Sequence, residues 1–255
     1  MTTGTRAGRA RLTIAVLTKN ESANIADCLK SVDGADEIVV VDDFSDDATM
    51  ETACQFGAKI VQRRLDSFAE QRNFALSAAA GDWVFFLDAD ERFSPGLMEE
   101  VRRHIEANPG RAGSVRRKNF AFGRRHHFGP LKPDRASRLF PANSVRWEGL
   151  IHERPLFKGP ARPLKGWLLH LTYRDFDHYL KKQHRYAAAW AAEAAGRGQT
   201  AGPMTAVIRA ALAFAKMLCL NLGFLGGPLC WALCFFHAGY TLTKYLKLHE
   251  INEKT

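Results

Sequence analysis

The sequence has few cysteines, and they form no pattern. Five are scattered along 255 residues, without a Cys-x-x-Cys pair. An odd and scattered set argues against a disulfide framework and against a zinc site. The plain reading is a protein that works in a reducing compartment.

The sequence also lacks a recognisable export signal. Its first apolar run, Leu12–Leu17, is shorter than the core of a signal peptide and is soon followed by Lys19, Asn20 and Glu21. We therefore expect a cytosolic body preceded by a tail over residues 1–10. Hydrophobic content of 46% and charged content of 25% exclude a disordered chain.

Acidic residues are scarce in one long stretch. Between Arg102 and Arg146 twelve lysines and arginines face only Glu106 and Asp134, in a chain of net charge +9. This block predicts an anionic partner: nucleic acid, a phosphorylated glycan or an acidic membrane surface. No interleaved aromatic or zinc-finger pattern accompanies the arginines, which disfavours nucleic acid.

What the chain does have is apolar segments that end in carboxylates. Trp83–Leu87 is apolar throughout, which is typical of a central parallel strand, and Asp88, Asp90 and Glu91 follow it. Ligands of open α/β sheets bind at the carboxyl ends of strands. Oxygen ligands at this spacing suit Mg²⁺ or Mn²⁺, although Asp-x-Asp is also a common surface turn.

Strand and helix patterns alternate over the first half of the chain. Strands are predicted at Leu12–Thr18, Glu37–Val41, Lys59–Gln62 and Trp83–Leu87, with helices at Ile25–Val32, Ala48–Phe56 and Phe68–Ala80. Short loops join them. This order predicts a doubly wound α/β sheet.

Four motifs in this order resemble glycosyltransferase family 2, the inverting nucleotide-sugar enzymes. They are Val16–Glu21, Val39–Thr49 with its Asp-Asp-x-Ser core, Gln71–Asn73 and Leu87–Glu91. The resemblance covers about residues 12–175 and implies a GT-A fold, Rossmann-like with a mostly parallel sheet. Arg138–Phe140, Ile151–Glu153 and the helical C-terminus are similar to the lipopolysaccharide core β-1,4-glucosyltransferase-like branch. Phe44 departs from the family, which commonly has glycine there, so the nucleobase loop is expected to differ in shape.

The resemblance implies roles for the residues after the strands. The donor-binding set is Thr18, Asn20, Glu21, Asp42, Asp43, Arg72 and Asp88. Asp90 and His170 would hold Mg²⁺ or Mn²⁺, with Asp88 assisting through water. Each has a plainer alternative: aspartates in this loop can cap a helix, and a histidine such as His170 can be a hydrogen-bonded core residue.

Inversion requires a base on the acceptor side. Family members carry an acid near the position of Glu153, which makes it the predicted base, with Glu148 as the alternative. A surface ion pair is the structural alternative for Glu153. The stretch Asn119–Phe140 reads as a mobile loop over donor and acceptor, with Arg124, Arg125 and Arg138 on the acceptor side.

After Tyr173 the chain changes character. An amphipathic helix is predicted at Asp175–Glu193, and Met217–Tyr240 contains no Asp, Glu, Lys or Arg over 24 residues. Gly226-Gly227-Pro228 interrupts this apolar segment, and lysines and arginines flank it. We expect a GT-A domain over 11–175 and a helical, membrane-associating region over 176–255 that lies in the cytoplasmic leaflet. A soluble dimerisation or packing helix pair is the alternative.

Together these features predict an inverting, metal-dependent hexosyltransferase. The expected donor is a UDP-hexose, UDP-glucose above all, and the expected acceptor is a lipid-linked glycan of the lipopolysaccharide inner core. The expected location is the cytoplasmic face of the inner membrane. A polyprenyl-phosphate glycosyltransferase is the second enzyme reading, and a basic nucleic-acid-binding protein is the alternative from another class. An Asp-x-Asp phosphatase is disfavoured because Leu12–Thr18 ends without an acid.

Overall fold

The chain folds into two compact units, seen in a computed structural model that describes residues 9–149 and 153–254. Unit 1 contains the chain up to Arg117 and Arg135–Leu169, and unit 2 contains Lys118–Asp134 and the chain from His170 onward. Of the predicted tail, residues 1–8 lie outside the described residues, as do Ile151 and His152 of the predicted acceptor motif.

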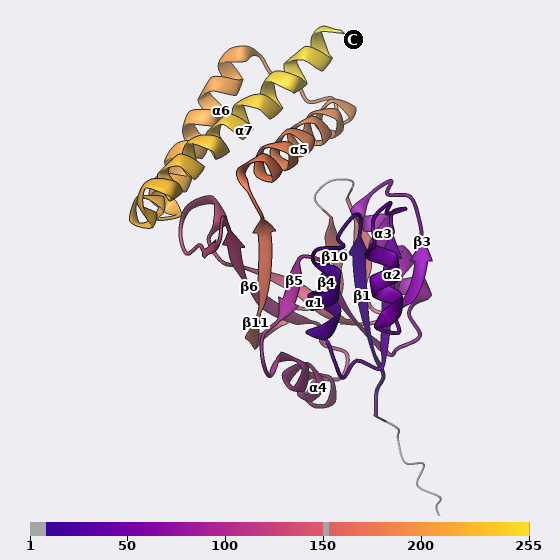
Figure 1. Ribbon diagram of the computed structural model, residues 1–255. Helices are drawn as coiled ribbons and strands as arrows, with labels where there is room; N and C mark the ends of the chain where they lie inside the picture. Colours follow the sequence, from indigo (N-terminus) through magenta and orange to yellow (C-terminus); the bar gives the residue numbers. More distant parts are fainter. Residues whose placement is uncertain (1–8, 150–152, 255) are drawn as a thin grey trace, which may run out of the picture. The chain divides into compact units, whose positions relative to one another are not determined.

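Unit 1 begins with the predicted alternation of strands and helices (Figure 1). The elements are β1 Leu12–Thr18, α1 Ile25–Lys30, β2 Glu37–Asp42, α2 Thr49–Gln55, β3 Lys59–Gln62, α3 Phe68–Ala78, β4 Trp83–Asp88, β5 Glu91–Phe93 and α4 Leu97–Ala107. The strands predicted at Leu12–Thr18 and Lys59–Gln62 match to the residue. Gly57 follows α2 with φ of 69°, a conformation that glycine adopts without strain.

The strands form a mixed sheet in the order β3-β2-β1-β4-β8-β6-β11-β5. β3, β2, β1 and β4 are parallel, whereas β8 (Asp134–Pro141) runs antiparallel to β4. The predicted doubly wound α/β fold is therefore confirmed, with an antiparallel extension beyond β4.

Both faces of the parallel sheet are buried, which explains why its strands are apolar without alternation. Ile14 and Phe85 belong to a core with α1, α2 and α4 on one face. Ala15 and Phe86 belong to a second core, with α3 and Trp147, on the other face. Successive side chains of one strand thus enter different cores.

The prediction that Asn119–Phe140 is a mobile loop is wrong, because most of this stretch has regular secondary structure. The elements of this middle region are β6 Gly113–Ala121, β7 Arg124–Arg125, the 3₁₀ helix η1 Gly129–Leu131, β8, β9 Arg146–Glu148, β10 Arg154–Leu156 and β11 Arg162–Tyr173. β7 pairs with β6, and β9 pairs with β10 as a separate two-stranded ribbon.

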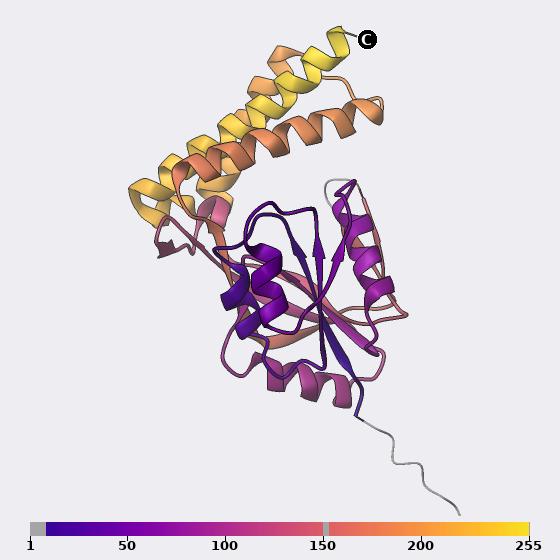
Figure 2. The same cartoon turned by 45° about the vertical axis from the view of Figure 1, so that its right-hand side comes forward.

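Unit 2 contains the helical C-terminus: α5 Phe176–Gly196, α6 Pro203–Ala215, the π-helical turn η2 Lys216–Leu220, the 3₁₀ helix η3 Gly223–Gly226, and α7 Gly227–Glu253. Asp175 caps α5 by accepting a hydrogen bond from the His178 amide at 2.7 Å. Both ribbon views draw α5, α6 and α7 side by side (Figures 1 and 2), and α7 packs against α5 and α6. The predicted break at Gly226-Gly227-Pro228 is confirmed, since α7 starts there.

Candidate active site

The polar residues predicted to bind a donor lie at the carboxyl ends of adjacent strands in unit 1. Thr18 at the end of β1 is in register with Asp42 at the end of β2. On the other side of β1, Leu17 is in register with Asp88 at the end of β4. Three predicted residues from distant parts of the sequence thus share one edge of the sheet, where α/β proteins bind ligands.

Hydrogen bonds within the loop after β2, and from neighbouring segments, hold this loop in place. Asp42 is fully buried, and its carboxylate accepts hydrogen bonds from the Ser45 amide at 2.8 Å and from the Ser45 hydroxyl. Asp43 accepts from the Leu65 amide at 3.0 Å. The Lys19 ammonium donates to the carbonyls of Asp43 and Phe44.

The loop after β1 is fastened to the same segment. The Asn20 amide donates to the Ser45 hydroxyl at 2.8 Å, and the Asn20 side-chain oxygen accepts from the Asp46 amide at 3.0 Å. The Glu21 amide donates to the Thr49 hydroxyl at 2.8 Å. The structure therefore brings Thr18, Asn20, Glu21, Asp42 and Asp43 together.

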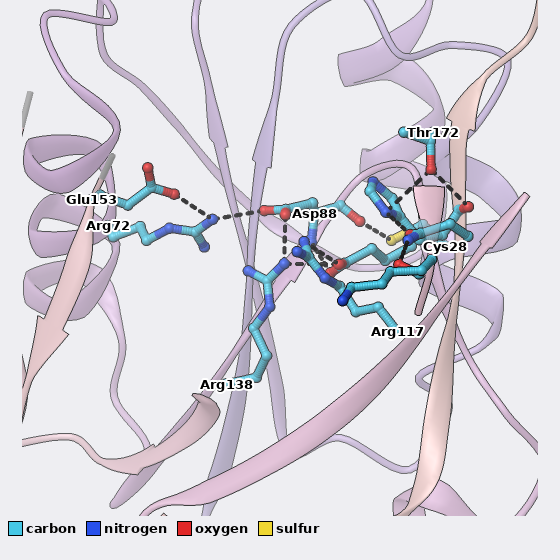
Figure 3. Close-up of polar contacts among 11 residues, drawn as sticks. Cys28, Arg72, Asp88, Arg117, Arg138, Glu153 and Thr172 are labelled. Carbon is cyan, nitrogen blue, oxygen red and sulfur yellow. Dashed lines mark hydrogen bonds and ion pairs between the residues drawn. The ribbon is translucent and has the colours of Figure 1, made fainter. Parts of the chain in front are cut away.

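Asp88 is fixed by two arginines (Figure 3). One carboxylate oxygen accepts from Arg72 Nη2 at 2.9 Å and the other from Arg138 Nη2 at 2.6 Å. Burial by itself would raise the pKa of Asp88, but the Arg138 and Arg72 guanidiniums outweigh it and hold that pKa well below its ordinary value. Asp88 is therefore an anion at neutral pH.

Arg138 points inward. Its side chain is only 4% exposed, and it also donates to the fully buried Glu91 at 2.7 Å. Burial alone would lower the pKa of Arg138, but the carboxylates of Asp88 and Glu91 raise it. Glu91 in turn accepts from the Asp88 amide at 3.0 Å, and Arg117 lies 3.6 Å from it. Arg138, predicted on the acceptor side, is thus bonded to the carboxylates that follow β4.

Arg72 on α3 links Asp88 to the predicted base. Its Nη2 lies 2.9 Å from Asp88 Oδ1 and 3.4 Å from Glu153 Oε1, so one nitrogen serves both carboxylates, as Figure 3 shows. The Arg72 guanidinium carbon lies 4.8 Å from the centre of the Trp147 ring and 5.6 Å from that of Phe86. These aromatic contacts favour a cation and hold the arginine in place.

Trp147 is placed by the residue next to Arg72. The Trp147 amide donates to the Asn73 side-chain oxygen at 2.9 Å, and the Asn73 side-chain amide donates to the Trp147 carbonyl at 3.0 Å. The consecutive residues Arg72 and Asn73 therefore attach the β9–β10 ribbon to α3 and to the end of β4.

A cavity of about 260 Å³ lies among these groups. Its lining comprises Arg72, Asp88, Arg117, Ala136, Ser137, Arg138, Trp147, Glu153 and Pro155. Glu148, the alternative base, is exposed on β9 and does not line it. A larger cavity, about 480 Å³ between Gly110 and Lys158, contains none of the predicted site residues.

The two predicted metal ligands belong to different units. Asp90 is half-buried in the turn after β4 in unit 1. His170 lies near the end of β11, in the portion that belongs to unit 2. Its Nδ1 is 2.8 Å from Asn119 Oδ1 and 3.3 Å from the Thr172 hydroxyl. Their pairing on one ion stays a prediction. Within residues 9–149 and 153–254, no group of three or more His, Cys, Asp or Glu side chains is arranged to hold a metal.

The oxygen chemistry after β4 nevertheless fits Mg²⁺ or Mn²⁺. Mg²⁺ commonly takes one or two carboxylates and completes its shell with water and substrate phosphates, so it does not require a three-residue cage. Both oxygens of Asp88 accept from arginines. Asp90, in the turn after β4, stays the predicted direct ligand.

Some residues of the site were not assigned by sequence. Glu91, Arg117, Asn73 and Trp147 had no predicted role, although Asn73 and Glu91 lie inside the recognised motifs. Arg124 and Arg125, predicted on the acceptor side, are exposed on β7 in unit 2.

Comparisons with known proteins match glycosyltransferases. The profile of the family described as Glycosyl transferase family 2 matches residues 13–154. An uncharacterised glycosyltransferase of Rickettsia felis is 40% identical over 87 residues, which are 34% of this chain and 31% of that protein. The chain thus spans about a third of the length of that relative.

A second relative matches over a longer stretch. The lipopolysaccharide core biosynthesis glycosyltransferase LpsC of Rhizobium meliloti is 28% identical over 193 residues, covering 68% of this chain and 67% of that protein. Among solved structures, glucosyl-3-phosphoglycerate synthase of Mycobacterium tuberculosis with Mn²⁺, UDP and glucosyl-3-phosphoglycerate is 26% identical over 45% of each chain, with a TM-score of 0.36.

Proposed function

The chain belongs to glycosyl transferase family 2, and on that basis we propose that it is a metal-dependent inverting hexosyltransferase. The proposed donor is a nucleotide sugar, UDP-glucose, and the proposed acceptor is a lipid-linked glycan of the lipopolysaccharide inner core. The family match and the similarity to LpsC support this proposal. The exposed basic residues Arg124, Arg125 and Arg146 of the block between Arg102 and Arg146 suit the phosphates of such an acceptor.

The observation that carries the proposal is the pair of carboxylates joined by Arg72. Asp88 ends the central strand β4, and Glu153 lies across Arg72 from it on the lining of the same cavity. The Glu153 side chain is 21% exposed, so water and a substrate hydroxyl can reach it. An inverting transfer needs a base on the acceptor side, apart from the donor diphosphate, and the two carboxylates provide that separation.

The residues of the chain then have distinct tasks. Glu153 accepts the proton of the acceptor hydroxyl as that oxygen attacks the anomeric carbon, and Arg72 orients the Glu153 carboxylate. Arg138 and Glu91 keep Asp88 in a fixed position at the end of β4. The loops that contain Asn20 and Asp43 form the donor side.

Asp90 would hold the divalent cation. When bound, the cation supplies counter-charge to the departing nucleoside diphosphate. His170 would contribute from unit 2 if its ring reached the same ion, which is part of the proposal.

Replacing Glu153 by Gln tests the proposed base. Gln preserves size and hydrogen-bonding reach but cannot take a proton, so kcat should fall by about 10²–10⁴ while donor affinity stays nearly constant. Glu148→Gln is the matched control, because Glu148 is exposed and does not line the cavity, and it should be mild. Steady-state kinetics and donor titration measure the two effects separately.

The reverse result, with Glu148→Gln severe and Glu153→Gln mild, would move the base to Glu148. If neither substitution lowers kcat, proton removal does not limit the reaction. An acceptor that is already an anion, such as a polyprenyl phosphate, would then replace the glycan hydroxyl.

A further inference from the structure

The helices α6 and α7 of unit 2, joined by η2 and η3 at their tip, form a hairpin that exposes a stripe of large apolar side chains. Met204, Ile208 and Leu212 recur every four residues on α6 and are 69%, 52% and 59% exposed. Residues four apart lie on one face of a helix, so these three form a continuous row. Leu220, at the end of the π-helical turn, is 77% exposed, and Leu225 on η3 extends the apolar surface at the tip of the hairpin.

Little of this stretch is buried. Over Pro203–Leu220, a stretch apolar and long enough by composition to cross a bilayer, only 6% is buried. Soluble monomers rarely leave contiguous apolar patches of this kind exposed, and such patches mark interaction sites. The hairpin is therefore expected to have a partner.

Charge indicates which partner. From Ala194 to His249 the sequence contains no Asp or Glu, while Arg197, Arg209, Lys216, Lys244 and Lys247 are present. Of these cations, Arg209 and Lys216 are exposed within the same stretch as the apolar row. A second copy of the chain packed against this stretch would bring those cations against its own. Anionic phospholipid headgroups would instead neutralise them while the acyl region receives the apolar stripe.

The tip of the hairpin is tied to a polar segment of its own unit. The Gly129 amide donates to the Asn221 carbonyl at 2.9 Å, and the Lys132 ammonium donates to the Asn221 side-chain oxygen at 2.7 Å. Gly129 also packs so tightly on α7 that an added Cβ would lie 2.6 Å from Cys230 Sγ. Passing the tip through the hydrocarbon would carry the Lys132 charge with it, which is strongly unfavourable.

We propose that α6 and the tip of the hairpin lie in the plane of an anionic bilayer surface, with the Met204–Ile208–Leu212 row in the boundary between headgroups and acyl chains. This surface would place the chain on the face of the membrane that carries its glycan acceptor, the cytoplasmic face of the inner membrane. The binding itself does not depend on the proposed reaction. Figure 2 shows α6 lying along α7, against which it packs.

Vesicle flotation of the full chain tests the proposal without any assay of activity. The wild-type chain should float with vesicles of phosphatidylcholine mixed with phosphatidylglycerol, and less with phosphatidylcholine alone or in high salt. Leu212→Glu should weaken binding at least about tenfold, because it removes a leucine that the bilayer would bury and adds a charge that anionic lipid repels. Phe56→Glu is the matched control: Phe56 is 39% exposed in unit 1, and its replacement should leave flotation unchanged.

Three results would overturn the proposal. The first is flotation of both Leu212→Glu and Ile208→Glu equal to that of the wild type. Circular dichroism would check that Ile208→Glu retains wild-type helicity. The second is retention in the membrane pellet after an alkaline carbonate wash, which would mean that the hairpin spans the bilayer. The third is a wild-type dimer that Leu212→Glu converts to a monomer without loss of vesicle binding, which would assign the stripe to a second copy.

Discussion

At the scale of single residues, the centre of unit 1 is a set of mutually dependent charges. Arg138 and Glu91 are almost completely buried and bond to each other at 2.7 Å. A buried ion pair adds little net stability, but removal of one partner leaves an uncompensated charge in the interior. Their value here is geometric, because the same arginine fixes Asp88 at the end of β4.

Phe44 shows how the donor loop deals with an unfavourable backbone conformation. The sequence predicted a changed loop shape here, because phenylalanine stands where the family commonly has glycine. Phe44 nevertheless has φ of 53°, in the left-handed region that glycine favours. The Lys19 ammonium bonds to its carbonyl, and the Arg64 guanidinium carbon lies 4.9 Å from the centre of its ring. The surrounding contacts therefore impose the conformation on a residue that disfavours it.

A pair of substitutions measures this strain. Phe44→Gly should be more stable than Phe44→Ala by about 0.5–1 kcal/mol, since the left-handed conformation costs an alanine about 1–2 kcal/mol and the greater freedom of unfolded glycine offsets part of that difference. Both variants lose the ring and its contact with Arg64, so only the backbone term differs. Urea denaturation of the two proteins gives the comparison. Equal stabilities would mean that the loop relaxes out of the positive φ in the alanine variant.

At the scale of elements, Asp36 joins three segments at the start of the sheet. Its carboxylate accepts from the Leu12 amide at 2.7 Å at the beginning of β1, from Arg102 on α4 at 2.6 Å, and from Arg9 at 2.9 Å. Burial raises the pKa of Asp36, but these hydrogen bonds outweigh it and lower the pKa from 3.8 to about 2. A depressed carboxyl pKa means that the folded state prefers the anion.

The stability contributed by Asp36 should therefore decrease as the pH is lowered. It is fully present above 3.8, where unfolded aspartate is ionised, and is lost as the pH falls toward about 2. Asp36→Asn should destabilise the protein by about 1 kcal/mol at neutral pH, after a discount for solvent screening at this surface site. The difference between the two proteins should shrink as the pH is lowered through the acid range.

Urea denaturation at several pH values measures this dependence. Asp33→Asn, in the same exposed loop, is the control and should change stability by less than about 0.5 kcal/mol. A penalty for Asp36→Asn that stays constant with pH would mean that the side chain acts through shape and not through charge.

At the scale of the whole molecule, the proposed donor-binding residues and Asp90 lie in unit 1, whereas the apolar stripe lies in unit 2. β6 and β11 run from one unit into the other, since Gly113–Ala121 and Arg162–Tyr173 each cross the boundary. Ligand binding and membrane binding can therefore be measured separately on the same intact chain.

Thermal unfolding of the intact chain should detect the donor. UDP-glucose at about a hundred times its Kd should stabilise the folded protein by about 2.7 kcal/mol, or roughly 5–10 °C in Tm, and only with Mn²⁺ or Mg²⁺ present. Asp90→Ala should abolish the metal-dependent part of the shift, while Glu153→Gln should preserve it. An equal shift in EDTA would contradict metal dependence, and a shift with another nucleotide sugar alone would reassign the donor.

The sequence by itself determined the α/β core and the positions of its acids. Strands buried on both faces must be apolar throughout, and helices must show apolar residues at helical spacing, so β1 to β4 and α1 to α3 could be predicted from local patterns. The acids Asp42 and Asp88 were predicted at the carboxyl ends of apolar strands, and the register of β1 with its neighbours places both at one edge of the sheet.

Only the tertiary structure decided which charges meet. Arg72 and Glu153 are separated by 81 residues, and Arg138 and Asp88 by 50, so no local pattern could pair them. The stretch Asn119–Phe140 read as a loop because its glycines, prolines and charges hide the pairing of β6 with β7 and of β8 with β4. Strand pairing depends on which partner strand lies alongside, and an ion pair depends on which side chains the fold brings together. Neither can be read from the spacing of residues that are close in the sequence.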